Sequence, residues 1–328
     1  MKPDRKIGPY RILRLINQGG QGSVFSGYDK RLHRRVAIKI YTFEVADGPR
    51  KSAQREAQFL ASIHSHTVVQ IYDVIESSKY IALIMEYVSG SSLEELLAAV
   101  CPSLASVLTV GADIAGALAL AHQQHIVHGD VKAANVLITE FGRAKLTDFG
   151  IARIIGEASS REWEAGSFDS LSPEQYLGHP LDGRTDLFAV GCLLYRMLSG
   201  EQPFFHDGRP DVNMLLTRAA RPLKDIVGGD VELPDQLVQM IDGLMQKDPA
   251  NRPNHAGKVR QTLQSLLRRL QRSSDNRSLL EARPYFRRES PATVVFSTPK
   301  GEAWRGQLAP QHVGIRATEF WYRDTMSR

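Results

Sequence analysis

The segment IVHGDVKAANVLI at residues 126–138, followed by the tripeptide DFG that begins at Asp148, is the most informative part of this 328-residue chain. Two apolar runs flank a short polar loop, which presents Asp130, Lys132 and Asn135. Short apolar runs bounded by turns are typical of buried strands, so these polar side chains are expected where strands end. A second strand-like run then leads to Asp148 and to a turn that ends in glycine.

These four side chains suit the transfer of a phosphoryl group. One carboxylate can orient a hydroxyl, a lysine can lie against phosphate, and an asparagine with an aspartate can hold Mg²⁺. The combination resembles the catalytic loop and the metal-binding turn of the protein-kinase superfamily. The resemblance implies catalytic roles for Asp130 and Lys132 and Mg²⁺ ligands in Asn135 and Asp148. A polar turn between two core strands could match so short a motif by chance, so other parts of the pattern are needed.

A glycine-rich turn between two predicted strands precedes this segment. Such a turn lets backbone N–H groups approach phosphate oxygens without an intervening Cβ. Asn17, Gly19 and Gly22 stand where the family has three glycines, and asparagine tolerates left-handed backbone better than most residues. The resemblance implies nucleotide binding at these three residues and at Val24, which follows them.

A lysine and a glutamate follow the glycine-rich turn. Lys39 ends the strand-like run VAIK, and Glu56 lies in a segment with helical spacing of its apolar residues. Such residues are usually solvated charges when they stand alone. As a pair in this order they resemble the kinase ion pair that directs the lysine at the α- and β-phosphates. The resemblance implies nucleotide binding by Ala37, Lys39 and Glu56, and a catalytic role for Lys39.

The periodicity of apolar residues divides the chain into two parts. Residues 9–85 alternate strand patterns with one helix, whereas residues 91–270 keep mostly helical spacing. The expected fold is therefore α+β, the bilobal protein-kinase fold, with a β-rich N-lobe, an α-helical C-lobe and a short β-rich C-terminal tail. By resemblance, Met85 is the gatekeeper position, although core packing explains it equally well. Glu86 and Val88 belong to the hinge whose backbone would hold adenine.

Three positions in the second part match structural elements of protein kinases. Glu174 follows Ser172 and a proline in the motif that closes the activation segment. Asp186 stands where the family uses an aspartate to brace the catalytic loop, and Arg252 matches the arginine that pairs with that glutamate. These are expected to be structural and not chemical roles.

The chain departs from the family pattern at Gly129, where an arginine usually precedes the catalytic aspartate. That arginine normally receives the phosphate of a phosphorylated activation loop through charge-assisted hydrogen bonds. The corresponding loop, Ile151–Leu171, contains no threonine. Its possible phosphorylation sites are Ser159, Ser160, Ser167 and Ser170. We therefore expect the unphosphorylated enzyme to be already competent.

The expected function is that of an ATP-dependent serine/threonine protein kinase of the bacterial, Hanks type, which also phosphorylates itself. Two alternatives stay open. Aminoglycoside phosphotransferases and related small-molecule kinases share the His-Gly-Asp sequence, but Lys132 is the hallmark of serine/threonine protein kinases. A pseudokinase scaffold usually lacks one of three residues that this chain retains, namely Lys39, Asp130 and Asp148.

The charge pattern gives no sign of a nucleic-acid partner. The net charge is +5, but residues 1–270 hold 31 Lys and Arg against 30 Asp and Glu. Binding of a phosphate backbone needs a basic face. The excess lies in residues 271–328, with 10 basic and 6 acidic residues, and is expected to be solvated.

The cysteines and the apolar runs predict a soluble, cytoplasmic protein. Cys101 and Cys192 suggest no disulfide framework, and Cys192 is expected to be a buried small hydrophobe. The charged N-terminus lacks the apolar segment of a signal peptide. The most apolar run, Val107–Ala121, contains Asp113 and is shorter than a membrane span, so it predicts a buried helix. Many bacterial kinases of this kind carry a transmembrane helix after the catalytic domain, and we expect none here.

The expected domains are a kinase domain at residues 9–270, a polar linker at 271–282 and a small β-rich appendage at 283–328. The appendage is predicted to form three short strands, Ala292–Ser297, Trp304–Leu308 and Ile315–Tyr322.

The start of the appendage, with Arg283 and Arg287, resembles the opening of a PilZ domain, which binds cyclic di-GMP. The second PilZ motif would fall on residues 309–314, where only Gly314 matches, and the appendage is too short for a PilZ barrel. A degenerate β appendage is therefore favoured over a cyclic di-GMP site.

Overall fold

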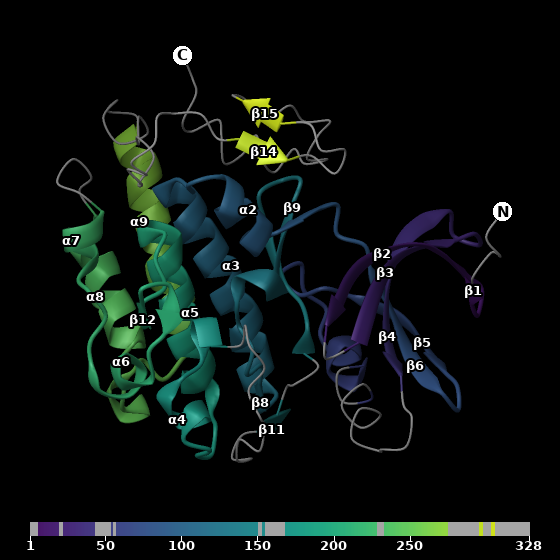
Figure 1. The fold of residues 1–328 in the computed structure, drawn as a ribbon, viewed down its shortest axis with the longest axis horizontal. Coiled ribbons are helices and arrows are strands. Elements are labelled where there is room, and N and C mark those ends of the chain that lie inside the picture. Colours follow the sequence, from purple (N-terminus) through teal and green to yellow (C-terminus); the bar gives the residue numbers. More distant parts are fainter. Residues whose placement is uncertain are drawn as a thin grey trace. The chain divides into compact units, whose positions relative to one another are not determined.

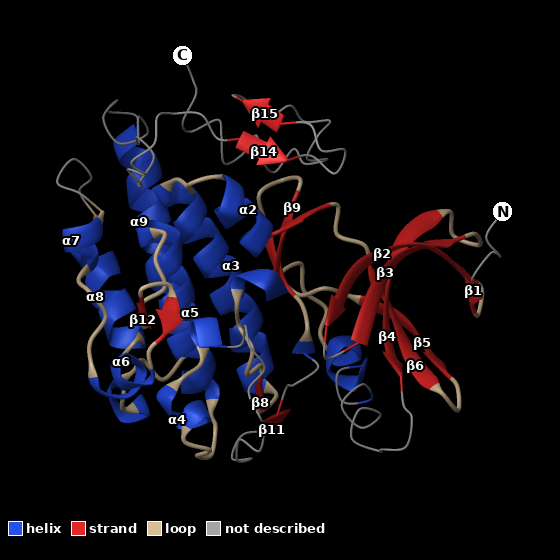
Figure 2. Ribbon diagram, viewed as in Figure 1, coloured by secondary structure: helices blue, strands red, loops and turns tan. Residues whose placement is uncertain are grey.

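The computed structural model of the chain describes residues 6–19, 22–42, 54, 57–149, 153–154, 168–227, 233–274, 295–297 and 303–305. The chain divides into two compact units, Met1–Val88 with Leu146–Ala152, and Ser89–Lys145 with Arg153–Arg328. The first unit is mostly strands and the second mostly helices (Figures 1 and 2).

The first unit is built on a six-stranded antiparallel sheet with the order β1-β2-β3-β4-β6-β5. Its strands are β1 (Lys6–Ile7), β2 (Tyr10–Gly19), β3 (Gly22–Asp29), β4 (Arg34–Thr42), β5 (Ile71–Glu76) and β6 (Tyr80–Glu86). The alternating apolar residues of β4 and β6 bury Val36, Ile38, Ala82 and Ile84 in one core cluster. Residues 57–62 are helical, as expected, and bury Phe59 and Leu60.

The segment that begins at Leu146 belongs to the first unit, although the sequence placed it within the second. The Leu146 N–H donates to the Thr67 carbonyl at 2.8 Å, and its own carbonyl accepts from the Val69 N–H at 3.1 Å. Three residues on, the ring of Phe149 packs on Phe59 with 4.3 Å between centroids. These contacts join residues far apart in the chain, which a periodicity of apolar residues cannot reveal.

The second unit contains eight helices among the residues that the structure describes. They are α2 (Leu93–Ala99), α3 (Leu104–Gln123), α4 (Pro173–Tyr176), α5 (Gly183–Ser199), α6 (Val212–Thr217), α7 (Leu223–Ile226), α8 (Asp235–Leu244) and α9 (Ala256–Ser274). Short strands and 3₁₀ turns connect them: β7 (Gly90–Ser92), β8 (Ile126–Val127), η1 (Ala133–Asn135), β9 (Val136–Thr139), β10 (Ala144–Leu146), β11 (Arg153–Ile154), η3 (Phe168–Ser170), β12 (Phe205–His206), β13 (Arg209–Pro210) and η4 (Pro249–Asn251).

Helix α3 is longer than the apolar run that predicted it. Its length and composition would suit a membrane span, but 78% of its most apolar window is buried inside the structure, as in a core helix. Ser103 caps its N-terminus by accepting from the Ser106 N–H. Asp113, which interrupts the run, is buried and accepts two hydrogen bonds from Arg143, at 2.6 and 2.8 Å, and one from the Ala144 N–H.

Helix α5 lies at the core of the second unit. Asp182 caps its start, and Gly200, with φ of +77°, ends it in the left-handed conformation that favours glycine. Cys192 on this helix is 1% exposed, which confirms its prediction as a buried hydrophobe. Burial raises the pKa of its thiol to about 12.

The polar linker was predicted to begin at residue 271, but α9 continues to Ser274, so the predicted start is too early. Gln271 and Arg272 are good helix formers, and a cation in the last turn is favourable for the helix dipole. Farther on, β14 (Val295–Ser297) pairs antiparallel with β15 (Ala303–Arg305). The third predicted strand and the residues of the PilZ comparison lie outside the described residues.

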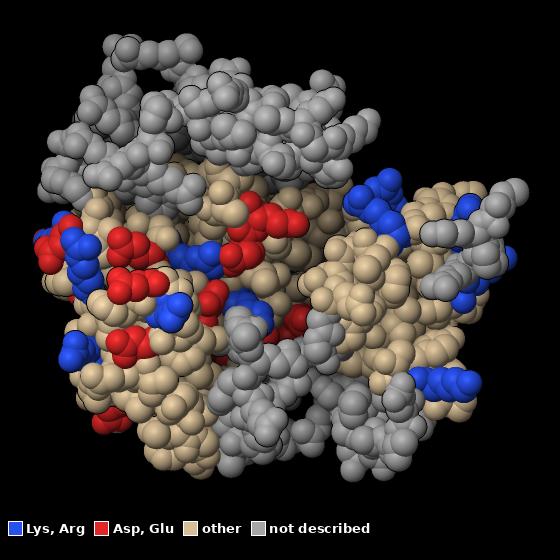
Figure 3. Space-filling view, in the orientation of Figure 1, with Lys and Arg blue, Asp and Glu red and all other residues tan. Residues whose placement is uncertain are grey.

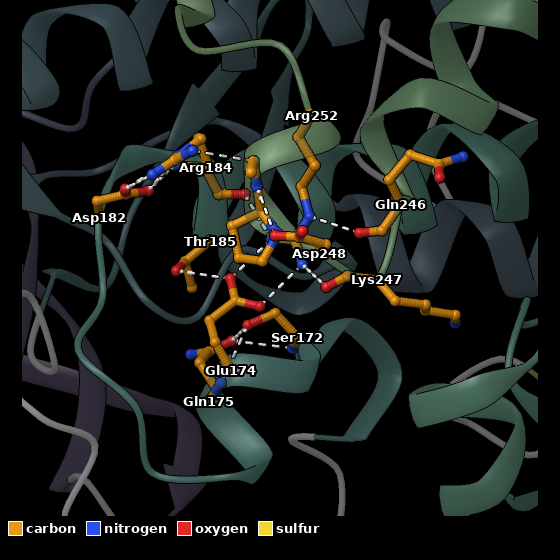
Figure 4. Close-up of polar contacts among 12 residues, drawn as sticks. Ser172, Glu174, Gln175, Asp182, Arg184, Thr185, Gln246, Lys247, Asp248 and Arg252 are labelled. Atoms are coloured by element: carbon orange, nitrogen blue, oxygen red, sulfur yellow. Dashed lines mark hydrogen bonds and ion pairs between the residues drawn. The ribbon is translucent and has the colours of Figure 1, made fainter.

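A buried ion pair holds α4 to the loop before α9 (Figure 4). Arg252, whose side chain is fully buried, donates to both carboxylate oxygens of Glu174 at 2.7 and 2.8 Å. Its other N–H groups donate to the carbonyls of Gln246 and Lys247. The hydroxyl of Thr185 on α5 also donates to Glu174, at 2.9 Å. The predicted pairing of Glu174 with Arg252 is confirmed.

Replacing Arg252 by methionine should lower the free energy of unfolding by about 3–5 kcal/mol, because Glu174 would keep its charge in a buried place without its cation. Arg252→Lys should recover only part of the loss, since an ammonium group cannot form two parallel bonds. The control is Arg184→Met, which breaks a half-exposed pair with Asp182 and should cost about 1 kcal/mol or less. Equal losses in denaturant unfolding for the two arginines would contradict this account.

Candidate active site

In the first unit, the sheet register brings together residues expected to bind a nucleotide. Asn17 lies opposite Val24 on the neighbouring strand, and Val24 lies opposite Lys39. Directly opposed residues of antiparallel strands point to the same face, and so do residues two apart on one strand. Ala37, two residues before Lys39, therefore shares that face. Asn17, Val24 and Lys39 thus form a row across three strands, and Ala37 extends this row along β4 on the same face of the sheet.

Lys39 and Asp148 meet within the first unit. The Lys39 Nζ lies 2.6 Å from Asp148 Oδ1, and the lysine side chain is only 5% exposed. Asp148 has a φ of +67°, in the left-handed region that side chains other than glycine rarely adopt. Such strain costs on the order of 1–3 kcal/mol and collects at functional sites. Glu56, the expected partner of Lys39, lies outside the described residues.

The backbone itself requires a glycine at position 22, where β3 begins. Gly19 pairs with Gly22, so the strands continue to within two residues of each other. Gly22 has a φ of +123°, and a Cβ there would collide with the carbonyl oxygen of Ile40. The sequence explained this glycine by access for phosphate, but the close approach of β4 already excludes any side chain.

The gatekeeper and hinge positions lie at the end of β6 and just after it. Met85 is 4% exposed and lies opposite Ala37, so it packs in the core at the edge of the row described above. The Glu86 N–H donates to the Gln70 carbonyl at 2.8 Å, and its carboxylate accepts from the Gln70 N–H. Val88 is half-buried and ends the first of the two segments that form the unit.

In the second unit, a single turn gathers the three polar residues of the loop between β8 and β9. The 3₁₀ turn η1 closes with a hydrogen bond from the Asn135 N–H to the Lys132 carbonyl. Lys132 Nζ then lies 2.9 Å from Asp130 Oδ2, and Asn135 Nδ2 donates to the same oxygen at 3.0 Å. Asn135 also donates to the Asp130 carbonyl. The Asp130 carboxylate is 6% exposed and firmly oriented.

Asp186 of α5 holds the backbone just before Asp130. Its two carboxylate oxygens accept from the N–H groups of His128 and Gly129 at 2.9 and 2.8 Å. The predicted brace of the catalytic loop is confirmed. His122 of α3 also contacts Asp186, with 2.8 Å between Nε2 and Oδ2, and the sequence had not indicated this residue.

An acidic residue lies near the catalytic loop on η3. Asp169 Oδ2 is 3.7 Å from Nη1 of Arg196, which is itself bound by both oxygens of Glu94 at 2.6 Å. Burial raises the pKa of Asp169, and the positive charges of Arg196 and Lys132 only partly oppose it. Ser170 follows and is buried, while the other serines of the activation loop lie outside the described residues.

The structure thus shows two clusters, each within its own unit. One contains Lys39, Asp148 and the row of sheet residues, and the other contains Asp130, Lys132 and Asn135. The first contains a buried cation, Lys39, which a site for the anionic phosphates of a nucleotide would need, and this cation is paired with the carboxylate of Asp148. The second presents an oriented carboxylate beside an ammonium group, which suits the activation of a hydroxyl next to a negatively charged group.

The chain matches a known domain family over most of its length, the protein kinase domain, at residues 10–266. It is 35% identical over 253 residues to the serine/threonine-protein kinase PrkC of Bacillus subtilis, covering 76% of this chain and 39% of that protein. It is 33% identical over 266 residues to the serine/threonine-protein kinase PknB of Mycobacterium leprae, covering 77% of this chain and 42% of that protein. It is 34% identical over 285 residues to the serine/threonine-protein kinase pkn2 of Myxococcus xanthus, covering 80% of this chain and 33% of that protein.

This chain spans between 33% and 42% of the length of these three relatives, and all three are named as serine/threonine kinases. The residues that match the family model, 10–266, include Lys39, Asp130, Lys132, Asn135 and Asp148. The chain is thus similar over most of its length to serine/threonine protein kinases of several bacteria, and it belongs to the protein kinase family, whose members use ATP.

Proposed function

We propose that this chain transfers the γ-phosphoryl group of Mg-ATP to serine and threonine hydroxyls of proteins, its own included. The observation that carries the proposal is the cluster of Asp130, Lys132 and Asn135. A carboxylate that accepts hydrogen bonds from both neighbours is held in one orientation, ready to accept a third from a substrate hydroxyl.

The roles follow from the charges. The substrate oxygen forms a bond to the γ-phosphorus while the bond from that phosphorus to the bridging oxygen of ADP breaks, and the hydroxyl proton passes to Asp130. Lys132, 2.9 Å from that carboxylate, brings a positive charge to the place where the transferred group is negative. The transition state is loose, so positioning and charge neutralisation supply most of the acceleration.

Asn135 and Asp148 fit Mg²⁺ by the chemistry of their donors. Asn135 uses its amide nitrogen toward Asp130, which turns its oxygen to the other side. Amide and carboxylate oxygens are ligands that Mg²⁺ accepts, and the ion takes its remaining ligands from phosphates and water. Accordingly, no group of three His, Cys, Asp or Glu side chains is needed, and none occurs among the described residues. Bound Mg²⁺ would neutralise charge on the phosphates.

The nucleotide would bind to the first unit, along the row of sheet residues that includes Lys39. Lys39 would neutralise the phosphates, and the backbone of Glu86 to Val88 would accept adenine. Asn17, Gly19, Gly22, Val24, Ala37 and Glu56 are proposed as the remaining nucleotide contacts.

Protein substrates are favoured over other partners. The retained Lys39, Asp130 and Asp148 argue against a scaffold without catalysis, and Lys132 argues against a small-molecule phosphotransferase. Nucleic acid is disfavoured by the near-neutral kinase domain. On the face of the second unit shown in Figure 3, basic and acidic side chains are interspersed.

The first prediction concerns chemistry. Lys39→Met, Asp130→Asn and Asp148→Ala should each lower phosphoryl transfer from radiolabelled ATP by at least about 10²-fold, since each removes a charge or an acceptor from the reacting groups. Lys79→Met, at an exposed turn, is the matched control and should retain full activity. All four proteins should show the same circular dichroism. Turnover by a folded Asp148→Ala protein at the normal rate would refute the assignment of the metal ligand.

A second prediction concerns the acceptor. Mapping of the autophosphorylated chain should find phosphate on serine or threonine and none on tyrosine, because Lys132 matches the serine/threonine pattern. Generic protein acceptors should be labelled more rapidly than an aminoglycoside. Labelling of the aminoglycoside alone would instead support the small-molecule phosphotransferase.

A third prediction follows from Gly129. A phosphate on the activation loop stabilises an active conformation only if a cation receives it, and a hydrogen bond to a charged group contributes about 1.5–3 kcal/mol. Gly129 removes the usual receptor, so phosphatase treatment should change the rate by no more than a few-fold. The idea fails if alanine at Ser159, Ser160 and Ser170 lowers activity a hundredfold and glutamate restores it. Ser167 is left unchanged, because the family uses a threonine there for catalysis.

A further inference from the structure

The peptide bond that joins Gly129 to Asp130 is held at both of its polar atoms. The Asp130 N–H donates to His128 Nδ1 at 3.2 Å. The Gly129 carbonyl accepts from the side-chain amide of Gln175 at 2.8 Å. The second of these contacts comes from α4, a helix 46 residues farther along the chain. Neither the family resemblance nor the catalytic chemistry described above uses Gln175.

The side chain of Gln175 has one available orientation. It is 4% exposed, and its Oε1 accepts from both the N–H and the hydroxyl of Ser172, at 3.0 and 3.1 Å (Figure 4). With two donors on its oxygen, the amide must direct its nitrogen to the other side, where the Gly129 carbonyl lies. All of these contacts support the same assignment of the amide oxygen and nitrogen of Gln175.

Gly129 needs such a restraint more than another residue would. Its φ is +74°, and a glycine exchanges readily between positive and negative φ because it has no Cβ. Rotation about this residue would swing the Asp130 carboxylate away from its place. Asp186 holds the Gly129 N–H, but only Gln175, among the described residues, is seen to hold the Gly129 carbonyl.

The helix that carries Gln175 is itself well anchored. The preceding residue is Glu174, whose carboxylate is bound by Arg252 and Thr185. Ser172 and Gln175 also form a capping box, in which each side chain bonds the backbone N–H of the other. A hydrogen-bond donor on this helix can therefore hold the catalytic loop in a fixed position.

We propose that Gln175 is a positioning residue for Asp130, which it holds in the catalytic geometry through the Gly129 carbonyl. The proposal rests on the kinase activity proposed above. Gln175 contacts neither the substrate nor the nucleotide in this assignment. A misplacement of about 1 Å at a reacting group can cost on the order of 10²-fold in rate. Loss of the Gln175 donor should therefore lower kcat by about 10- to 100-fold and leave the KM for ATP within about twofold.

The decisive variant is Gln175→Glu in the full chain. Glutamate is a standard partner in a capping box, so α4 should stay folded, while an ionised carboxylate at this buried position should lower the melting temperature. The ionised carboxylate cannot donate to the Gly129 carbonyl, and kcat should fall. Its protonated form can donate, so the activity of the variant relative to wild type should rise as the pH is lowered. A residue needed only for stability would show no such pH profile.

Two further variants complete the test. Gln175→Met lacks the donor without adding a charge and should show the same loss of kcat without the recovery at low pH. Ser172→Ala removes the cap and one donor to Gln175 Oε1 but keeps the backbone N–H that orients the amide, so it should lower the melting temperature with little effect on kcat. Wild-type kcat in Gln175→Glu and Gln175→Met, or losses of kcat that follow the melting temperature in all three variants, would overturn the proposal. An inactive wild-type chain would instead contradict the kinase activity.

Discussion

The carboxylate of Asp186 organises the second unit around the catalytic loop. It is buried in α5 and accepts two hydrogen bonds from backbone N–H groups next to Asp130. A buried carboxylate is costly unless its oxygens are matched by donors, and here the donors are the backbone groups whose position matters. The same bonds therefore offset the desolvation of the charge and hold the loop. Since most residues of α5 are buried, the loop is anchored to the core of its unit.

A second buried charge cluster extends this anchorage to α4. Arg252, Glu174 and Thr185 join three segments that are distant in the sequence, and Gln175 stands next to this cluster on the same helix. The pair of Glu174 and Arg252 thus anchors the helix that also carries the Gln175 donor. Stability and catalysis are connected here by neighbouring residues of one short helix.

A site residue in each unit has a left-handed backbone conformation, Asp148 in the first unit and Gly129 in the second. Gly129 takes a left-handed φ of +74° at little cost, because glycine has no Cβ. Asp148 takes a similar φ of +67° with a side chain, which does cost energy. The residue that must present a carboxylate cannot be glycine, and the carboxylate of Asp148 contacts Lys39 at 2.6 Å.

Much of the fold and many site contacts were predictable from local patterns. Helices α2, α3 and α8 follow their apolar spacing, and the loop from Asp130 to Asn135 is contained in one short motif. The errors occurred where the pattern is weak or misleading. The end of α9 carries polar residues that suit a helix as well as a linker, and Leu146 continues an apolar run while its backbone pairs elsewhere.

By itself, the sequence determined the family, the order of the elements and the side chains that we propose as catalytic, because these depend on residue type and on spacing along the chain. Only the tertiary structure decided that Lys39 meets Asp148, that Gly22 is required by the approach of β4, and that Gln175 holds Gly129. These contacts join residues between 18 and 109 positions apart. Their existence depends on sheet register and helix packing, which a linear pattern of residues does not contain.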